Sequence, residues 1–310
     1  KIKKACGTLP EKHANKKDVV FINECPQVNK HIAVLMPKLL EKIEKNDLKF
    51  KLFGADFLSS SDGDIVVSLL YHRKLDSIWQ EKANQIAKEL SISIIGRSRK
   101  QKLVIGNDHI IEKYLINSNM YRSKHIENSF TQPNARVNEK MIEWALENLH
   151  DVGDDLLELY CGAGNFTIPF AKLFKNVLAT EISKSSINAA KENMLLNGVK
   201  NIEFVRMSVE EFTQALDGVR EFRRMKHIDT SQYNIKTVFV DPPRSGMYES
   251  TCSFGSRYTN ILYISCSPDT LHRDIKILSQ THMIENMAIF DQFPYTHHVE
   301  MGVKLIKKVA

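Results

Sequence analysis

A cysteine stands at residue 266, directly after an apolar stretch that has the character of a strand. The sequence there reads ILYISCSPDTL (261–271), so Cys266 lies where the chain leaves the strand, between two serines and before a proline. Most free cysteines are small buried hydrophobic residues. A cysteine held at a strand end could instead be a nucleophile. The local sequence alone leaves both interpretations open.

A Gly-x-Gly turn is the second feature with chemical potential. ELYCGAGNF (158–166) follows an apolar strand, and its glycines, Gly162 and Gly164, would let a ligand approach the backbone closely. Glu181 closes the next apolar strand, 19 residues after Gly162, where a carboxylate can accept hydrogen bonds from ribose hydroxyls. The third glycine of the dinucleotide fingerprint is missing, which disfavours NAD. The pattern favours a nucleoside cofactor such as S-adenosylmethionine over a merely structural turn.

Two further polar segments follow apolar strands. In VDPPRSG (240–246) the prolines fix the backbone that carries Asp241 and Arg244, and an arginine there suits a phosphate or a base carbonyl. A rigid turn with a surface ion pair is the simpler alternative. FPYTHHVE (293–300) places adjacent histidines before Glu300. Neighbours in an extended segment point to opposite sides, and no third ligand is evident, so we expect no metal site.

A methyl donor, a thiol and a carboxylate together suit one difficult reaction. Carbon 5 of uracil is a poor nucleophile, but a thiolate that adds to carbon 6 creates an enolate that can take up a methyl group at carbon 5. A base must then remove the carbon-5 proton before the cysteine leaves. The thiol needs a lowered pKa, to which Arg244 could contribute. The target base must also leave its stack.

The elements that would position these residues alternate regularly in the second half of the chain. We predict strands at 155–160, 176–180, 201–206, 237–240, 260–264, 287–290 and 302–307, and helices at 134–149, from about 166, and at 185–197, 209–216 and 270–279. This order predicts a doubly wound, mostly parallel, seven-stranded Rossmann-like sheet. Ligands in such sheets bind beyond the carboxyl ends of the strands, where all the residues above fall.

The first part of the chain predicts a smaller α/β region. Strands are expected at 64–71, 91–95 and within 104–116, and a helix at 78–90, so we predict one domain over 1–123 and a second over 124–310. No apolar run approaches the roughly 18 residues of a membrane span. The net charge of +6 permits an anionic partner without demanding one. The chain begins with Lys1, so we expect a fragment or a processed chain.

Several long motifs, in order, resemble one known family. They are VVSLLYHRKLD (66–76), ENSFTQPN (127–134), ELYCGAGNF, ATEIS (179–183), FVDPPRSG (239–246), ILYISCSP (261–268) and FDQFPYTHHVE (290–300). Together they are similar to the tRNA (uracil-5-)-methyltransferases, the bacterial enzymes that make ribothymidine in the T-loop. The resemblance runs from about residue 50 to the end. It implies an α/β fold with a Rossmann-like S-adenosylmethionine-dependent catalytic domain and a smaller N-terminal RNA-binding domain.

The resemblance also implies roles for individual residues. Cys266 matches the nucleophile and Glu300 the base that removes the carbon-5 proton, while Arg244 is expected to support them. The positions that match cofactor contacts, with the Gly162 turn, are Gln132, Tyr160, Gly162, Asn165, Glu181 and Asp241. The expected cofactor is S-adenosylmethionine, and no metal is expected. Residues 1–30 depart from the family, so the N-terminal region is expected to be truncated or divergent. A second, milder departure is Ala163 in the Gly-x-Gly turn, where the family has an asparagine.

The implied partner is the T-arm of tRNA, with other T-loop-like RNAs as further substrates. Neither DNA nor a membrane is expected, and the implied enzyme is a cytoplasmic monomer. The rivals are an rRNA uracil-5 or an RNA cytosine-5 methyltransferase, a non-catalytic RNA-binding protein on the same fold, and a dehydrogenase. A cytosine-5 enzyme would be expected to carry a cysteine in the DPPRSG segment, which has none. Arg97, Arg99, Lys100 and Lys102 are candidate phosphate contacts.

Overall fold

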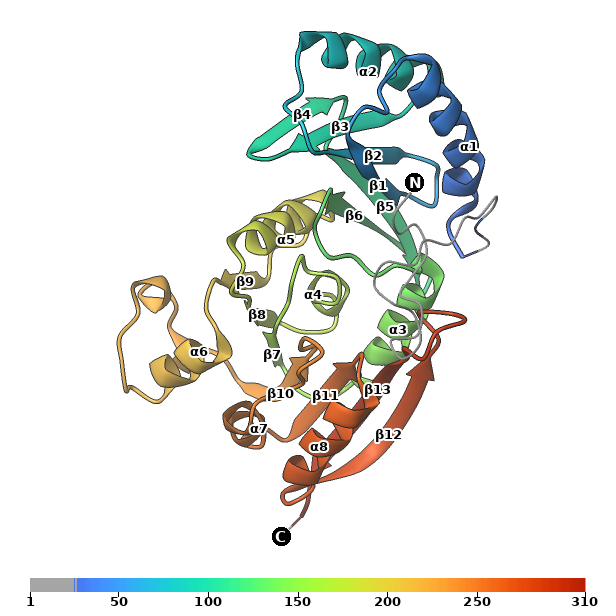
Figure 1. The fold of residues 1–310 in the computed structure, drawn as a ribbon. Helices are drawn as coiled ribbons and strands as arrows, with labels where there is room; N and C mark the ends of the chain where they lie inside the picture. Colours follow the sequence, from blue (N-terminus) through green and yellow to red (C-terminus); the bar gives the residue numbers. More distant parts are fainter. Residues whose placement is uncertain (1–24, 26, 310) are drawn as a thin grey trace. The chain divides into compact units, whose positions relative to one another are not determined.

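The computed structural model describes residue 25 and residues 27–309, which form two compact units (Figure 1). The first unit consists of the chain up to residue 113 with 124–131 and 294–297; the second consists of 114–123, 132–293 and the chain from 298 onward. The functional division between 1–123 and 124–310 stays a prediction. The divergence expected within residues 1–30 lies mostly outside the described residues.

A four-stranded sheet and two helices make up most of the first unit. The sheet order is β1 (Leu52–Ser59), β2 (Ile65–Tyr71), β3 (Ser93–Ser98) and β4 (Gln101–Ile105), and the helices are α1 (Lys30–Lys45) and α2 (Ser77–Leu90). Only β2 and β3 are parallel, because α2 crosses between them. Both helices pack on the same face through one apolar cluster. The strand expected at 64–71 and the helix expected at 78–90 are confirmed.

Helix α1 was not predicted, and Pro37 inside it explains why. Proline removes a backbone donor and usually ends or kinks a helix. Here Ile32, Leu35, Leu39 and Ile43 are all buried at helical spacing. Their burial against α2 and the sheet stabilises the helix despite the proline.

A two-stranded ribbon of β5 (His109–Ile116) and β6 (Asn119–Ile126) follows β4. Asn117 and Ser118 join the strands, and both have positive φ (46° and 62°). Two such residues are typical of the tight turns that match strand twist, and asparagine tolerates this conformation well. The segment 114–123 around the turn belongs to the second unit.

The second unit is built on a seven-stranded sheet in the order β12-β13-β11-β10-β7-β8-β9. The strands are β7 (Asp155–Leu159), β8 (Asn176–Thr180), β9 (Ile202–Val205), β10 (Ile235–Val240), β11 (Asn260–Ser265), β12 (His282–Phe290) and β13 (Glu300–Lys307). All neighbours are parallel except at β13, which is antiparallel to both β11 and β12. The strand order reverses between β7 and β10, where ligands bind in doubly wound sheets. The predicted fold class is therefore confirmed.

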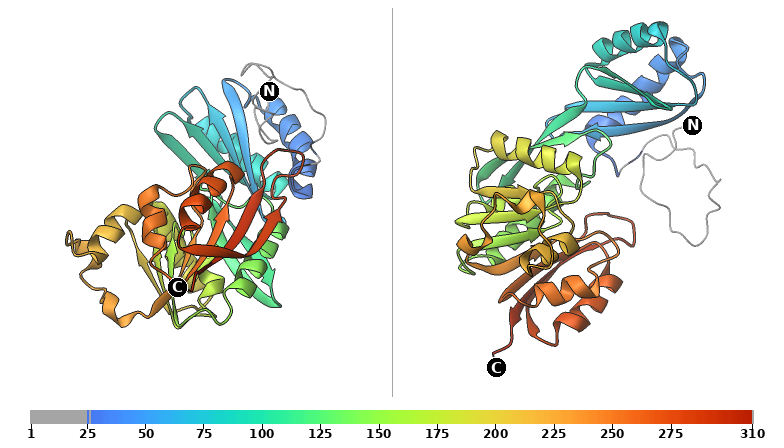
Figure 2. Two further views of the ribbon diagram at one scale, coloured as in Figure 1. Left: turned by 90° about the horizontal axis from the view of Figure 1, so that it is seen from below. Right: turned by 90° about the vertical axis from the view of Figure 1, so that its left-hand side faces the viewer.

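Helices cover both faces of this sheet (Figure 1). On one face lie α3 (Ala135–Asn148), α4 (Thr167–Phe170) and α5 (Lys184–Leu196); on the other lie α6 (Val209–Leu216), α7 (Glu249–Gly255) and α8 (Pro268–Leu278). Alternate residues of each central strand enter the two separate apolar clusters, as on β7, where Leu156 faces the first cluster and Leu157 the second. Figure 2 shows α8 beside the C-terminal strands.

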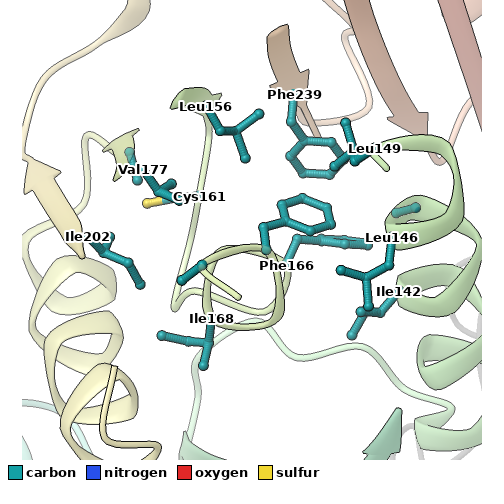
Figure 3. Packing of buried hydrophobic residues seen from close by; sticks show 14 of the residues in the cluster. Ile142, Leu146, Leu149, Leu156, Cys161, Phe166, Ile168, Val177, Ile202 and Phe239 are labelled. Carbon is teal, nitrogen blue, oxygen red and sulfur yellow. The ribbon is translucent and has the colours of Figure 1, made fainter. Parts of the chain in front are cut away.

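The core beneath the Gly-x-Gly turn is rich in aromatic rings. Phe166, which immediately follows the turn, packs against Phe239 of β10 with ring centroids 4.9 Å apart. Figure 3 shows both rings beside Ile142 and Leu146 of α3. The turn is therefore supported from below by a fully packed layer, which fixes its position relative to β10.

The predicted strands and helices of this unit are confirmed, with small shifts at their ends. The helix expected from about 166 is only the four residues of α4, and α7 was not predicted. Strand β12 begins at His282, well before the expected 287. Among the described residues, no helix combines the length and apolar character needed to cross a membrane.

Candidate active site

Strand register places Cys266 opposite Glu300. Ser265, the last residue of β11, pairs with Met301 of antiparallel β13. The next pair beyond this one is therefore Cys266 and Glu300, which lie 34 residues apart in sequence. Cys266 is half-buried, and Glu300 is buried with 4% of its surface exposed. The sheet thus brings the thiol and the carboxyl group to one edge.

Asp241 and Arg244 reach the same edge from β10. Val240 pairs with Tyr263 of parallel β11, so Asp241 follows at the level where β11 is about to end. Both Asp241 and Arg244 act electrostatically on Cys266, and Arg244 also acts on Glu300. The three residues predicted to carry the chemistry, Cys266, Glu300 and Arg244, therefore form one cluster with Asp241, a predicted cofactor contact.

The cluster contains two carboxyl groups that hold protons unusually tightly. Burial, together with the nearby Glu300 carboxylate, raises the pKa of Asp241 to about 8. Burial raises the pKa of Glu300 to about 7, although the Arg244 guanidinium opposes this shift. Burial also raises the pKa of the Cys266 thiol; Glu300 and Asp241 raise it further, while Arg244 lowers it. Arg244 is thus the group that favours both a thiolate and an ionised Glu300.

The Gly-x-Gly turn lies at the end of β7 and is tied to β8. Glu181 accepts hydrogen bonds from the backbone N–H of Gly162 (3.2 Å) and of Ser183 (2.7 Å). Tyr160 and Gly162 have positive φ, 63° and 55°. This conformation is strained for tyrosine, and such strain is concentrated at functional sites. A side chain on Gly162 would meet no atom within 4 Å, so the space above the turn is open.

Two asparagines that sequence reasoning missed hold the turn from below. Asn138 of α3 and Asn165 exchange reciprocal amide hydrogen bonds of 2.8 and 2.9 Å. Asn193 of α5 donates to the carbonyl of Ala163 at 3.0 Å. Asn138 and Asn193 are almost fully buried, so each is a polar residue on the covered side of a helix. On α5 the other buried residues are apolar, so the placement of Asn193 among them is the signal that could have revealed it.

Gln132 lies in the segment before α3. Its side-chain oxygen accepts a hydrogen bond from Gln292, which follows β12, at 2.8 Å. Gln292 is buried, and its own side-chain oxygen has no hydrogen-bond partner among the described residues. The pair joins the start of the second unit to the segment that leads towards Glu300.

The residues around the turn fit a cationic nucleoside better than a dinucleotide. A pyrophosphate needs free backbone N–H groups, but the N–H of Gly162 is already used by Glu181. Glu158 of β7 is fully buried, and its Oε2 has no hydrogen-bond partner. Burial raises its pKa well above the ordinary value, and Asp241 adds to the shift. The turn thus offers few free backbone donors, which suits S-adenosylmethionine, a cofactor without phosphate groups, better than a dinucleotide.

The remaining cysteines of the second unit have a different setting. Cys161 and Cys252 are buried and free, and burial raises the pKa of each thiol. The nearby carboxyl groups of Glu158 and Glu181 raise the pKa of Cys161 further. A buried thiol with a raised pKa is unreactive, so Cys161 is a packing residue. Within the described part of the chain, no group of three or more His, Cys, Asp or Glu side chains is arranged to hold a metal ion.

Comparisons with known proteins identify the family. A profile of the tRNA (uracil-5-)-methyltransferase family matches residues 11–308. A protein of Sulfurimonas denitrificans named tRNA/tmRNA (uracil-C(5))-methyltransferase is 64% identical over 295 residues, covering 95% of this chain and 80% of its own length. A protein of the same name from Nitratiruptor is 52% identical over 294 residues, covering 94% and 82%.

A solved structure supports the fold. The crystal structure of Pyrococcus abyssi tRNA (uracil-54, C5)-methyltransferase in complex with S-adenosyl-L-homocysteine superimposes with a TM-score of 0.69 at 23% identity, covering 93% of this chain and 70% of that one. A putative S-adenosylmethionine-dependent methyltransferase of Streptococcus mutans gives 0.52 at 12% identity, covering 90% and 83%. With the profile match over almost the whole chain, these findings place the protein in the tRNA (uracil-5-)-methyltransferase family.

Proposed function

We propose that this protein transfers a methyl group from S-adenosylmethionine to carbon 5 of a T-loop uridine in tRNA, and that Cys266 forms a covalent adduct with the uracil. The observation that carries the mechanism is the register of β11 and β13, which sets a half-buried thiol opposite a buried carboxyl group. A protein that only bound RNA would need neither group. The family and the names of its close relatives support the reaction itself.

Cys266 acts first in the proposed sequence. Its thiolate adds to carbon 6 of the uracil, the double bond between carbons 5 and 6 breaks, and the charge moves into an enolate. The thiolate must form against the burial and the two carboxyl groups that raise its pKa, so the positive charge of Arg244 favours this step. When bound, S-adenosylmethionine would supply an electrophilic methyl group to carbon 5 of the adduct, and the bond from that methyl group to the sulfonium sulfur would break to leave S-adenosylhomocysteine.

Glu300 completes the reaction. Its carboxylate removes the proton from carbon 5, the electrons reform the double bond, and the bond between carbon 6 and the sulfur of Cys266 breaks. A base works best when its pKa lies near the working pH. Burial raises the pKa of Glu300 to about 7, which places it in that range.

The proposed cofactor contacts surround the Gly-x-Gly turn. The carboxylate of Glu181, fixed by two backbone N–H groups, keeps lone pairs that can accept from the ribose hydroxyls. The open space above Gly162 admits the nucleoside, and Tyr160 and Asn165 border the turn. Asp241 is proposed to contact the cofactor close to the thiol, on which it acts electrostatically. Gln132 is proposed as a further contact.

The proposed RNA partner is the T-arm, with other T-loop-like RNAs as possible further substrates. The target uridine must leave its stack to reach Cys266. We further propose that the protein acts as a cytoplasmic monomer.

The basic run proposed to contact phosphate divides into two pairs. Arg97 is bound by the buried Glu127, and Lys102 pairs with Asp108 at 2.9 Å. Arg99 and Lys100 lie on the exposed turn between β3 and β4. We therefore propose Arg99 and Lys100, rather than all four residues, as phosphate contacts.

The decisive experiment traps the adduct. A T-arm RNA hairpin with 5-fluorouridine at the target position is mixed with the protein and S-adenosylmethionine, and the products are separated on a denaturing gel. Fluorine replaces the proton that Glu300 would remove, so the adduct should persist as a shifted band. The band should vanish in Cys266→Ala and remain in the control Cys252→Ala, which removes another thiol of the same unit. A band that persists in Cys266→Ala would overturn the covalent role.

A further inference from the structure

The backbone around Arg244 is clamped by helix α8. Met247 donates its backbone N–H to Asp274 at 2.7 Å, and Arg273 donates to the carbonyl oxygens of Ser245 (2.8 Å) and Met247 (2.9 Å). The hydroxyl of Thr270 donates to the carbonyl of Arg244 itself at 3.3 Å. The base of the Arg244 side chain is therefore fixed by hydrogen bonds.

Gly246 makes this clamp possible. It has a φ of 71°, and a Cβ there would lie 2.6 Å from Asp274 Oδ2 and 2.7 Å from Arg273 Nη2. A side chain at this position would displace the Asp274 and Arg273 groups that form these hydrogen bonds. The clamp nevertheless ends at the backbone, and the long side chain of Arg244 is exposed. An exposed arginine with several rotatable bonds needs a further contact to keep one orientation.

The imidazole ring of His298 supplies that contact. Arg244 Nη2 lies 3.3 Å from Nε2 and 3.5 Å from Nδ1 of His298. The two ring nitrogens flank one carbon, so an in-plane approach at nearly equal distances would bring Nη2 into collision with that carbon. The guanidinium therefore lies over the ring face, where a planar cation can stack on an aromatic surface.

Phe293 holds the imidazole ring in turn. Its ring centroid lies 5.9 Å from that of His298, with an angle of 70° between the planes. This edge-to-face arrangement is a favourable aromatic pair. His298 lies only two residues before Glu300, which is the first residue of β13. One aromatic pair thus connects the segment that bears the carboxyl group to the guanidinium that acts on the thiol.

We propose that His298 is a positioning residue, whose ring face, braced by Phe293, keeps the guanidinium of Arg244 directed at the reactive cluster. The proposal rests on the proposed function, because it gives Arg244 its purpose in activating Cys266. The charged and titratable groups that face Cys266 are Glu300, Asp241 and Arg244. Of these, Arg244 alone is positive and favours the thiolate. Loss of the ring should therefore leave the thiol with two neighbours that disfavour ionisation.

Alkylation of Cys266 measures this effect without RNA or cofactor. Iodoacetamide reacts with the thiolate, and mass spectrometry of the peptide that contains Cys266 gives the rate at each pH. His298→Ala should move the midpoint of the pH profile upward by about one unit, and should slow alkylation near neutral pH about tenfold. His298→Phe keeps an aromatic face and should restore most of the rate. The control His297→Ala changes the exposed neighbouring histidine and should leave the profile unchanged.

The outcomes separate this inference from the proposed function. An unchanged profile in both His298→Ala and a second variant, His298→Gln, would overturn the positioning role, even if wild-type protein forms the 5-fluorouridine adduct. Failure of wild-type protein to form that adduct would overturn the covalent mechanism, even if the alkylation profiles differ. In the full reaction, His298→Ala should lower kcat about tenfold and leave the Kd for S-adenosylmethionine unchanged. A change in that Kd with no change in kcat would contradict the proposal.

Discussion

Glu127 of the first unit and Glu300 of the second are both buried, with 8% and 4% of their surfaces exposed, yet their environments are opposite. Burial alone would raise the pKa of Glu127, but hydrogen bonds from Arg97 and Ser68 outweigh it, and the pKa is lowered. Burial raises the pKa of Glu300 to about 7, and Arg244 only partly offsets it.

The difference separates a structural carboxylate from one suited to catalysis. Arg97 donates from both its Nε and Nη2 atoms to the two oxygens of Glu127, so this carboxylate stays ionised and holds β3 against the residues after β6. Glu300 belongs to a cluster in which Asp241 also has a raised pKa, and nearby Glu158 leaves an oxygen without a partner. Poorly satisfied, desolvated acids at strand ends are costly to fold and typical of active sites.

The largest expected effect comes from Glu300→Gln. The amide keeps the shape but cannot take the carbon-5 proton, so turnover should fall by about 10²- to 10⁴-fold. With ordinary uridine RNA, the covalent adduct should accumulate on a denaturing gel, because the thiol cannot leave. Stability should change little. Normal turnover in this variant would assign the proton transfer to another group.

The matched substitution Glu127→Gln should lower stability and leave turnover nearly unchanged. It leaves Arg97 without its ionic partner, and the free energy of unfolding of the first unit should fall by about 2 kcal/mol. The protein has two tryptophans, of which Trp79 lies in the first unit. Urea unfolding in a Trp144→Phe background, followed by fluorescence, therefore reports on this unit. Glu44→Gln, which changes an exposed glutamate on α1, is the control. A loss of stability as small as in the control would show that the ion pair contributes nothing.

Asp241→Asn should change the pH dependence of stability. The folded-state pKa of Asp241 is raised to about 8, so its contribution to stability is fully present below about pH 4 and is lost as the pH rises through 8. Asparagine does not ionise, so the variant should gain about 4–5 kcal/mol relative to wild type between pH 4.5 and pH 8.5. Unfolding followed through Trp144 in a Trp79→Phe background tests this. A difference independent of pH would refute the raised pKa.

The sequence was most informative at strand ends and least informative about contacts between distant segments. Cys266, Asp241 and Glu181 could be found because each directly follows an apolar strand, and the ends of parallel strands meet at one edge. Helix α1 was missed, because proline normally ends a helix, and only tertiary burial stabilises it here.

Hydrogen-bond partners from elsewhere in the chain could not be predicted. Asn138 and Asn165 are 27 residues apart, and nothing local to either indicates the other. The basic run at 97–102 also has partners from elsewhere in the chain that its own sequence does not indicate. Its charges suggested RNA, but half of them are matched by Glu127 and Asp108, whose approach depends on how β4, β5 and β6 fold back.

The smallest expected effect is a change in RNA binding when Arg99 and Lys100 are replaced. If Arg99 and Lys100 contact phosphate, the double substitution to alanine should weaken binding of a T-arm hairpin, and should reduce the slope of log Kd against log salt by about two. Lys102→Ala is the matched control, because its ammonium is already paired with Asp108, and the slope should change by less than about half a unit. The 5-fluorouridine adduct should still form at saturating RNA in both variants. An equal loss of slope in the two variants would mean that Lys102 contacts the RNA despite its ion pair with Asp108. The difference between paired and unpaired charges that separates Glu127 from Glu300 would then not apply to these surface residues.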